Sequence, residues 1–266
     1  MPNSNKNSTD ATGAPTDNTP FFIIGCVRSG TTMLRDVIAS HPRLFCPNET
    51  HFFRLADPFG TMPFVRPLMN QKLFINHRER DKITEEQFRD EILLKSTTRA
   101  GLMEKYGEAY LKAQNAPPNS RWFDKTPQNA FGALLLTQQF PQSKIVHIVR
   151  NPLNVMASLR TSKVMTIKEP VGSANYWLES TTILHTLKKL IEDRLFEISY
   201  HQFTNHPKES LEEICEFLGE DATQIKFNLK KIKPEKNKYK TVLTADDIEI
   251  ARSICGSLAK EYGYVF

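Results

Sequence analysis

Three positively charged side chains of this 266-residue chain each follow a short apolar run, at a point where a strand would give way to a helix. They are Arg28, Lys125 and Arg150. Because the carboxyl ends of parallel strands meet at one edge of a sheet, we expect these three cations to lie together. Such a cluster indicates a site for a polyanionic ligand, although each cation taken alone could equally be a surface charge.

The segment Gly25-Cys26-Val27-Arg28-Ser29-Gly30-Thr31-Thr32 has the spacing of a phosphate-binding loop. Glycine lets backbone amides approach an anion, and the N-terminus of the following helix adds partial positive charge. Loops that bind nucleoside triphosphates carry a lysine where this chain has Thr31, and their magnesium is held by an acidic residue that no predicted strand supplies. We therefore expect this loop to bind a phosphate-like group, although glycine-rich turns also serve purely structural roles.

A second anion site is predicted where Arg150 leads into a helix that starts at Pro152. On that helix Asn154 and Ser158 share a polar face, while the apolar residues between them face the core. Arg150 and Ser158 could therefore hold one anion between a strand end and the second turn of a helix. A capped helix with a solvated face is the alternative.

Apolar runs alternate with helical periodicity along the chain, which predicts an α/β fold with a mostly parallel sheet covered on both faces. Further helices are expected at about 84–115, 173–194 and 244–261. We also expect Thr126 to cap a helix that starts at Pro127. Residues 1–19 are predicted to form a disordered tail, and 20–266 a single domain with a helical insertion at about 54–118 that caps the substrate.

The composition is that of a globular protein: 35 basic minus 30 acidic residues give a net charge of +5, with 39% hydrophobic and 24% charged residues. It excludes a disordered, collagen-like or disulfide-dense chain. No apolar run reaches the roughly 20 residues that span a bilayer, so we expect no membrane partner. Four cysteines far apart in sequence indicate free thiols and a cytoplasmic protein without a metal site.

The sequence resembles the sulfotransferases that use 3'-phosphoadenylyl sulfate (PAPS) as donor. "FFIIGCVRSGTTML" is similar to their 5'-phosphosulfate loop, and "KIVHIVRNPLNVMASL" to their 3'-phosphate strand and helix. "WFDKTPQN", "ISYHQF" and the closing "YGY" also match in order. The loop arginine, followed by "NETHFF", looks most like the tyrosylprotein sulfotransferase branch and its bacterial relatives, although His51 stands where that branch has arginine. The resemblance implies a three-layer sandwich with a phosphosulfate-binding loop.

The resemblance also implies in-line transfer of a sulfuryl group to a hydroxyl acceptor, without a metal, leaving adenosine 3',5'-bisphosphate (PAP). It places the general base at Glu49 and a leaving-group cation at Arg28. His51 is the rival base, because an unshifted histidine pKa suits proton transfer. Lys125 would contact the sulfonate or the acceptor. The implied donor ligands are Arg28, Ser29, Gly30, Thr31, Thr32, Arg150, Ser158, Tyr200 and Lys238.

Residues 226–240 hold seven lysines against one acid, Glu235, which gives this stretch a charge of +6. A solvated face, a nucleic-acid patch and a flap over the anionic donor are all compatible with it. The resemblance favours the flap, with Lys238 as its contact, and no nucleic-acid partner.

The acceptor class is not encoded in any motif: small molecules, lipids, sugars and peptides all remain open, as does a homo-oligomer. Phenylalanines at 52–74 could line an acceptor pocket or form the core under a helical cap. Two other functions compete with sulfuryl transfer. They are a nucleotide kinase and a non-catalytic module that binds 3'-phosphonucleotides or RNA.

Overall fold

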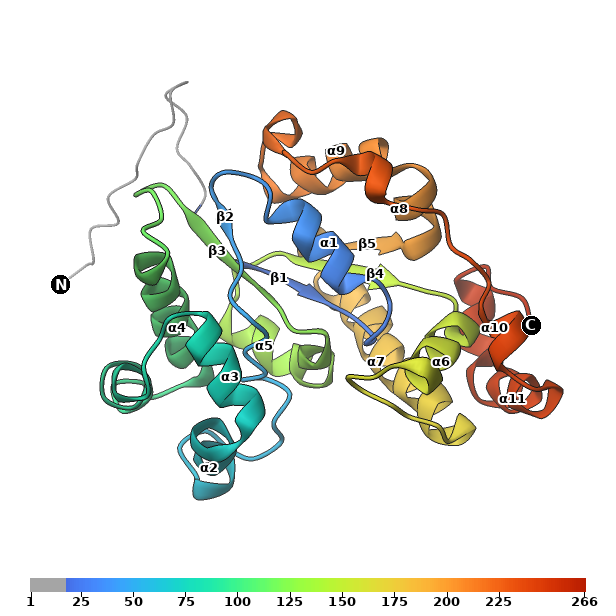
Figure 1. Ribbon diagram of the computed structural model, residues 1–266, viewed down its shortest axis with the longest axis horizontal. Helices are drawn as coiled ribbons and strands as arrows, with labels where there is room; N and C mark the ends of the chain where they lie inside the picture. The colour runs from blue at the N-terminus through green and yellow to red at the C-terminus, as the bar shows by residue number, and fades with distance from the viewer. Residues whose placement is uncertain (1–17) are drawn as a thin grey trace.

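The sheet has five strands, all parallel, in the order β2-β3-β1-β4-β5 (Figure 1). The computed structural model describes residues 18–266. The strands are β1 (Phe21–Ile24), β2 (Leu44–Phe45), β3 (Arg121–Lys125), β4 (Ile145–Val149) and β5 (Leu195–Ser199). The predicted α/β fold with a parallel sheet is confirmed. Only β2 was not predicted from the sequence, because its two apolar residues are too few to indicate a strand.

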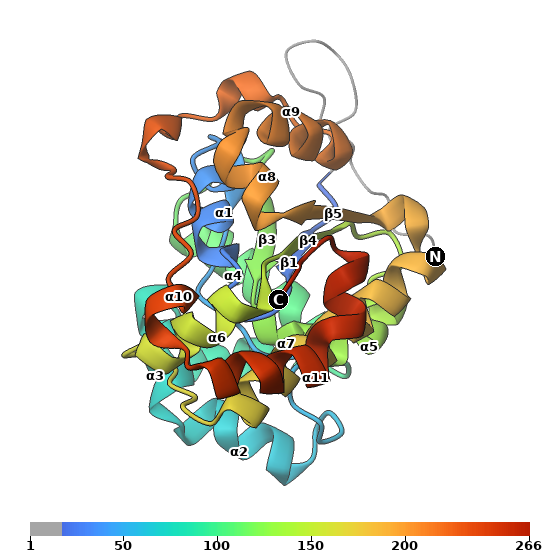
Figure 2. The same cartoon turned by 90° about the vertical axis from the view of Figure 1, so that its right-hand side faces the viewer.

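Helices cover both faces of the sheet, so alternate residues of each strand are buried on opposite sides. Phe21 and Ile23 of β1 pack toward α1 (Thr31–Ile38) and α9 (Pro207–Leu218). Phe22 and Ile24 pack toward the opposite layer, whose helices lie on the other side of the sheet from α1 and α9 (Figures 1 and 2). That layer contains α4 (Arg99–Ala113), α5 (Ala133–Gln139) and α7 (Pro170–Leu190). The result is the expected three-layer sandwich.

The remaining helices lie at the ends and edges of the sheet. They are α2 (Met62–Asn70), α3 (Lys72–Arg80), a π-helix (Gln87–Leu93), α6 (Pro152–Thr161), α8 (Tyr200–Asn205), α10 (Tyr239–Val242) and α11 (Ala245–Glu261). Short 3-10 turns occupy Pro127–Gly132, Glu192–Arg194, Ala222–Gln224 and Leu229–Lys231. Among the described residues no helix is long and apolar enough to cross a membrane.

Between β2 and β3 the chain forms α2, α3, the π-helix and α4, where the helical insertion was expected. The helix predicted over about 84–115 is broken into two pieces. The π-helix ends at Leu93, and α4 begins after Thr98, whose hydroxyl accepts a hydrogen bond from the Gly101 amide at 3.0 Å. A hydroxyl residue at this position caps a new helix more readily than it continues an old one.

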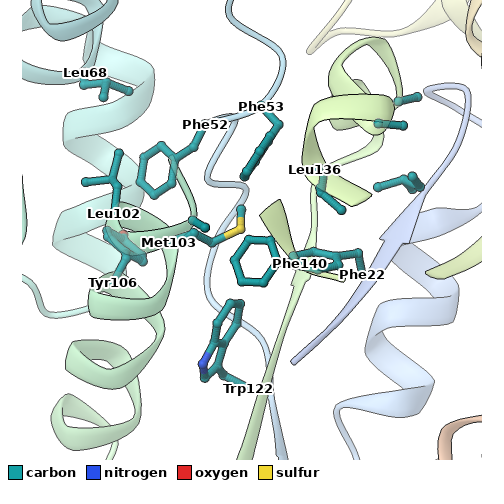
Figure 3. Close-up of a cluster of buried hydrophobic side chains, with 14 of the residues drawn as sticks. Phe22, Phe52, Phe53, Leu68, Leu102, Met103, Tyr106, Trp122, Leu136 and Phe140 are labelled. Atoms are coloured by element: carbon teal, nitrogen blue, oxygen red, sulfur yellow. The ribbon is translucent and has the colours of Figure 1, made fainter. Parts of the chain in front are cut away.

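The phenylalanines that follow Glu49 belong mostly to the core (Figure 3). Phe52, Phe53, Phe64 and Phe74 are at most 4% exposed and pack with aromatic residues of β3 and α4. The interpretation as core under a helical cap therefore holds for them, although Phe52 and Phe74 also line a small hollow of about 220 Å³ that reaches Glu49.

One local expectation needs correction, and another falls mostly outside the described residues. Thr126 precedes a 3-10 turn instead of an α-helix, and its hydroxyl bonds to Asp124 instead of capping. The predicted tail, residues 1–19, lies mainly outside the described residues. The structure does describe Asn18 and Thr19, which accept hydrogen bonds from Arg43 and Arg121.

Candidate functional site

The glycine-containing loop joins the end of β1 to the start of α1, at the carboxyl edge of the sheet (Figure 1). The first N–H groups of an α-helix have no carbonyl partner within the helix, so those of Thr31 and Thr32 are available to an anion. Gly30 precedes them with a φ of +100°, a conformation that L side chains rarely adopt. A Cβ at Gly30 would also lie 2.5 Å from the Tyr200 ring. Glycine is therefore required here by both backbone and packing.

Arg28 and Arg150 lie side by side, as the sequence analysis expected. The Arg150 guanidinium donates to the Arg28 carbonyl at 2.8 Å, and Arg28 Nε donates to Ser158 Oγ at 3.0 Å. Trp177 fixes the backbone beneath them, because its indole N–H donates to the Arg150 carbonyl at 2.8 Å. The predicted 5'-phosphate and 3'-phosphate ligands are thus parts of one continuous site.

Tyr200, the first residue of α8, forms the wall behind this pair of arginines. The Arg150 guanidinium carbon lies 4.4 Å from the centroid of the Tyr200 ring, which is a cation–π distance. The other edge of the ring packs against Gly30. Tyr200 therefore fixes the position of Arg150 relative to the loop at Gly30.

Two adjoining hollows open at this place, and both are lined by Arg28, Arg150, Ser158 and Tyr200. The smaller, of about 480 Å³, reaches the start of α1. The larger, of about 1290 Å³, extends over α6 to the lysine-rich stretch. Its lining there comprises Lys233, Pro234, Glu235, Lys236 and Lys238. Lys238 therefore lines the same hollow as Arg28 and Arg150.

Lys125, the last residue of β3, connects the phosphate loop to Glu49. Its ammonium group lies 3.3 Å from Thr32 Oγ1 and forms an ion pair with Glu49 Oε1. Lys125 is buried, whereas the Glu49 side chain keeps 31% of its surface exposed. A carboxylate with an open side thus lies beside the position where an anion would meet α1.

His51 lies close to Glu49 but in a different environment. It is 3% exposed, and burial lowers the pKa of His51 to about 2, assisted by the nearby Arg54, His77 and Lys125. The Glu49 carboxylate, 3.5 Å from His51 Nε2, favours the protonated form, but burial outweighs it. His51 is therefore neutral at ordinary pH and enclosed by protein.

The loop that carries Glu49 is held by a buried acid on β3. Asp124 Oδ1 accepts hydrogen bonds from Thr50 Oγ1 at 2.9 Å and Thr126 Oγ1 at 3.0 Å, and Oδ2 accepts from Asn129 at 3.1 Å. Complete burial raises the pKa of Asp124 to about 6, although the Thr50 and Thr126 bonds oppose this shift. Asp124 thus fixes the loop that carries Glu49 next to Lys125, its neighbour on β3.

Ser29 is the one predicted ligand that faces away from the hollows. Its side chain is fully buried, and its amide donates to the Cys26 carbonyl at 3.2 Å. Ser29 was expected among the donor ligands with its neighbours, but its position in the loop does not reveal whether its side chain turns toward the site.

Several contacts at the site had no sequence signal. Glu235 pairs with Arg150 Nε at 2.5 Å, and Asn237 accepts a hydrogen bond from Asn154 at 3.2 Å. Both join residues more than 80 positions apart, so only the folded chain brings them together. Within residues 18–266 no cluster of His, Cys, Asp and Glu could hold a metal ion. The four cysteines are free and buried.

Comparison with known proteins was informative at the level of family. A sequence profile described as "Sulfotransferase family" matches residues 20–224. An uncharacterized protein of Aquifex aeolicus is 27% identical over 74% of this chain and 25% of its own length. Protein-tyrosine sulfotransferase 2 of Gallus gallus is 25% identical over 75% of this chain and 50% of its own length.

Among solved structures, the sulfotransferase domain of the Synechococcus PCC 7002 olefin synthase covers 97% of this chain and 99% of that domain. The TM-score is 0.61 at 20% identity, so this likeness concerns the fold. The chain spans a quarter to a half of the length of the curated relatives named above.

Proposed function

Because the chain belongs to the sulfotransferase family, we propose that it transfers a sulfuryl group from PAPS to a hydroxyl group of an acceptor. One observation carries the proposal: Arg28, Arg150 and Ser158 surround one site at the start of α1. PAPS is anionic at two separated positions, the phosphosulfate and the 3'-phosphate. A site with cations from two strand ends and free amides between them matches this distribution of charge.

In this proposal the residues of the loop and of α6 hold the donor. The amides at the start of α1, with Thr31 and Thr32, bind the 5'-phosphate. Arg150 and Ser158 bind the 3'-phosphate, and Lys238 contacts the donor from the rim. Tyr200 keeps Arg150 directed toward the site through the cation–π contact.

The reaction is an in-line displacement at sulfur. The acceptor oxygen forms a new bond to sulfur as the bond from sulfur to the bridging oxygen breaks, and PAP leaves. Glu49 takes the proton of the acceptor hydroxyl, Arg28 stabilises the charge that develops on the bridging oxygen, and Lys125 contacts the transferred group. No step is assigned to a metal.

The environments of the two candidate bases favour Glu49 over His51. Glu49 has a partly exposed carboxylate beside Lys125, whereas His51 is enclosed and neutral. An acceptor hydroxyl can therefore reach the oxygen atoms of Glu49 more readily than the ring of His51. The acceptor itself is proposed only as a hydroxyl-bearing molecule.

Calorimetry with PAP and with ATP plus magnesium tests the donor. We expect metal-independent binding of PAP and weak binding of ATP; the opposite ranking would support a nucleotide kinase. Incubation with labelled PAPS and a panel of alcohols, phenols, sugars and peptides, followed by mass spectrometry, tests the transfer. PAP binding without any sulfated product across the panel would favour a non-catalytic nucleotide-binding module.

A further inference from the structure

Glu235, the single acid of the lysine-rich stretch, forms an ion pair with Arg150, whose guanidinium is proposed to bind the 3'-phosphate. Glu235 Oε1 lies 2.5 Å from Arg150 Nε, and its side chain is only 9% exposed. Lys233, Lys236 and Lys238 line the same hollow. No ion pair between Glu235 and these three lysines is found within the described chain, so the carboxylate is committed to Arg150.

The other contacts of Arg150 leave its Nε edge as the one directed at residues 233–238. Its Nη1 donates to the Arg28 carbonyl, and its flat face lies against Tyr200. The Nε edge meets a carboxylate from a residue 85 positions away. The same edge and the same charge pairing would suit a phosphate oxygen, because both anions accept hydrogen bonds from a guanidinium.

The segment 233–238, here called the strap, is held at both ends. Ile232 is 7% exposed and packs into the core beside α1 and α9, and Tyr239 packs against the core formed by α6, α7 and α11. Between them, Asn237 accepts a hydrogen bond from Asn154 of α6 at 3.2 Å. Figure 2 shows the chain running from α9 past α1 to α10. The strap can therefore release one side chain while its ends stay anchored.

We propose that the Glu235 carboxylate occupies the position of the 3'-phosphate on Arg150. A 3'-phosphorylated nucleotide must therefore displace this carboxylate when it binds. This inference rests on the proposed donor. Glu235 weakens the binding of PAPS and PAP, and its return to Arg150 assists the departure of PAP. Once displaced, the carboxylate has the strap lysines beside it, so its charge need not move into an apolar region. A nucleotide without a 3'-phosphate does not compete with Glu235 for Arg150, so its affinity does not depend on Glu235.

The test is Glu235→Gln in the full chain, with calorimetric titration of PAP and of adenosine 5'-phosphate, which lacks the 3'-phosphate. We expect the PAP dissociation constant to fall about tenfold, the effect of removing one partly buried competing ion pair. The adenosine 5'-phosphate constant should change by less than about twofold. Stopped-flow release of PAP should slow in proportion, since affinity changes within one site reside mostly in dissociation.

Glu249→Gln is the matched control, because it changes the net charge equally on the exposed surface of α11. It should leave both dissociation constants unchanged. Glu235→Ala should also tighten PAP binding. Agreement between the two variants would show that the effect comes from loss of the carboxylate and not from new contacts of the glutamine amide. If the wild-type chain binds PAP and neither Glu235 variant binds it more tightly, the inference is wrong while the proposed function stands. If the wild-type chain binds no PAP, both are wrong.

Discussion

Replacement of Glu49 by glutamine separates the proposed base from its neighbours. The amide oxygen of glutamine can still accept a hydrogen bond from Lys125, but it cannot take a proton from the acceptor. A positioned general base contributes about 10²–10⁴ in rate, so kcat should fall by that factor, equivalent to about 3–5 kcal/mol in activation free energy. Donor binding should change little, because the cations at the start of α1 stay in place.

The same substitution has a cost in stability that follows from the Lys125 environment. The Lys125 side chain is 5% exposed and would lose its charged partner, a change that costs about 3–5 kcal/mol for a fully buried pair. Since Glu49 keeps 31% of its surface exposed, water screens the pair and we expect about 1–2 kcal/mol. Urea denaturation measures this term separately from turnover.

The assay compares kcat at saturating donor, with an acceptor from the panel, in Glu49→Gln and His51→Gln. We expect the first variant to lose about 10²-fold or more and the second less than about tenfold. PAP titration checks that the donor site is intact in both. Near-normal turnover in Glu49→Gln, together with a large loss in His51→Gln, would refute the reasoning and assign the base to His51.

Three further expectations concern the same site. Gly30→Ala should abolish PAP binding and cost more stability than Gly60→Ala in thermal melting, because both have positive φ but only at Gly30 does the new Cβ meet a ring, at 2.5 Å. Arg150→Met should weaken PAP by about 10²-fold in calorimetry and adenosine 5'-phosphate by less than about threefold, which isolates the 3'-phosphate; equal losses would contradict this. The His51 pKa of about 2 lies below its unfolded value of 6.5, so the unfolded chain takes up a proton that the folded chain does not. The contribution of His51 to stability should therefore fall by about 1.4 kcal/mol per pH unit below pH 6.5, while the raised pKa of Asp124 opposes the loss below about pH 6. The difference in unfolding free energy between the wild-type chain and His51→Gln, measured in urea at pH 7 and 5, isolates the His51 slope; an unchanged difference would contradict it.

The parts predicted most accurately are those with dense local signals. Strand β1 is a continuous apolar run, β4 is apolar except for His147, and the glycine spacing after β1 indicates the loop. Arg28, Arg150 and Ser158 follow from these elements, because parallel strands place their ends at one edge. The helix expected to start at Pro152 does so, and Asn151 caps it by accepting a hydrogen bond from the Leu153 amide at 2.9 Å.

The parts that were missed depend on tertiary contacts. β2 exists because it pairs with β3, and its sequence has no strand signal of its own. The Thr126 hydroxyl does not cap the following turn because it donates a hydrogen bond to the buried Asp124. The pairing of Glu235 with Arg150 joins two distant segments, so no local pattern could indicate it.

The central position of β1 has a consequence for how the site comes into being. β1 pairs with β3 on one side and with β4 on the other, so its loop has no cationic neighbours until both partners have docked. Contacts between segments so distant in sequence form late relative to local helices. A growing or refolding chain would thus remain unable to capture nucleotide through most of its assembly. Nucleotide capture would then report the completion of the sheet.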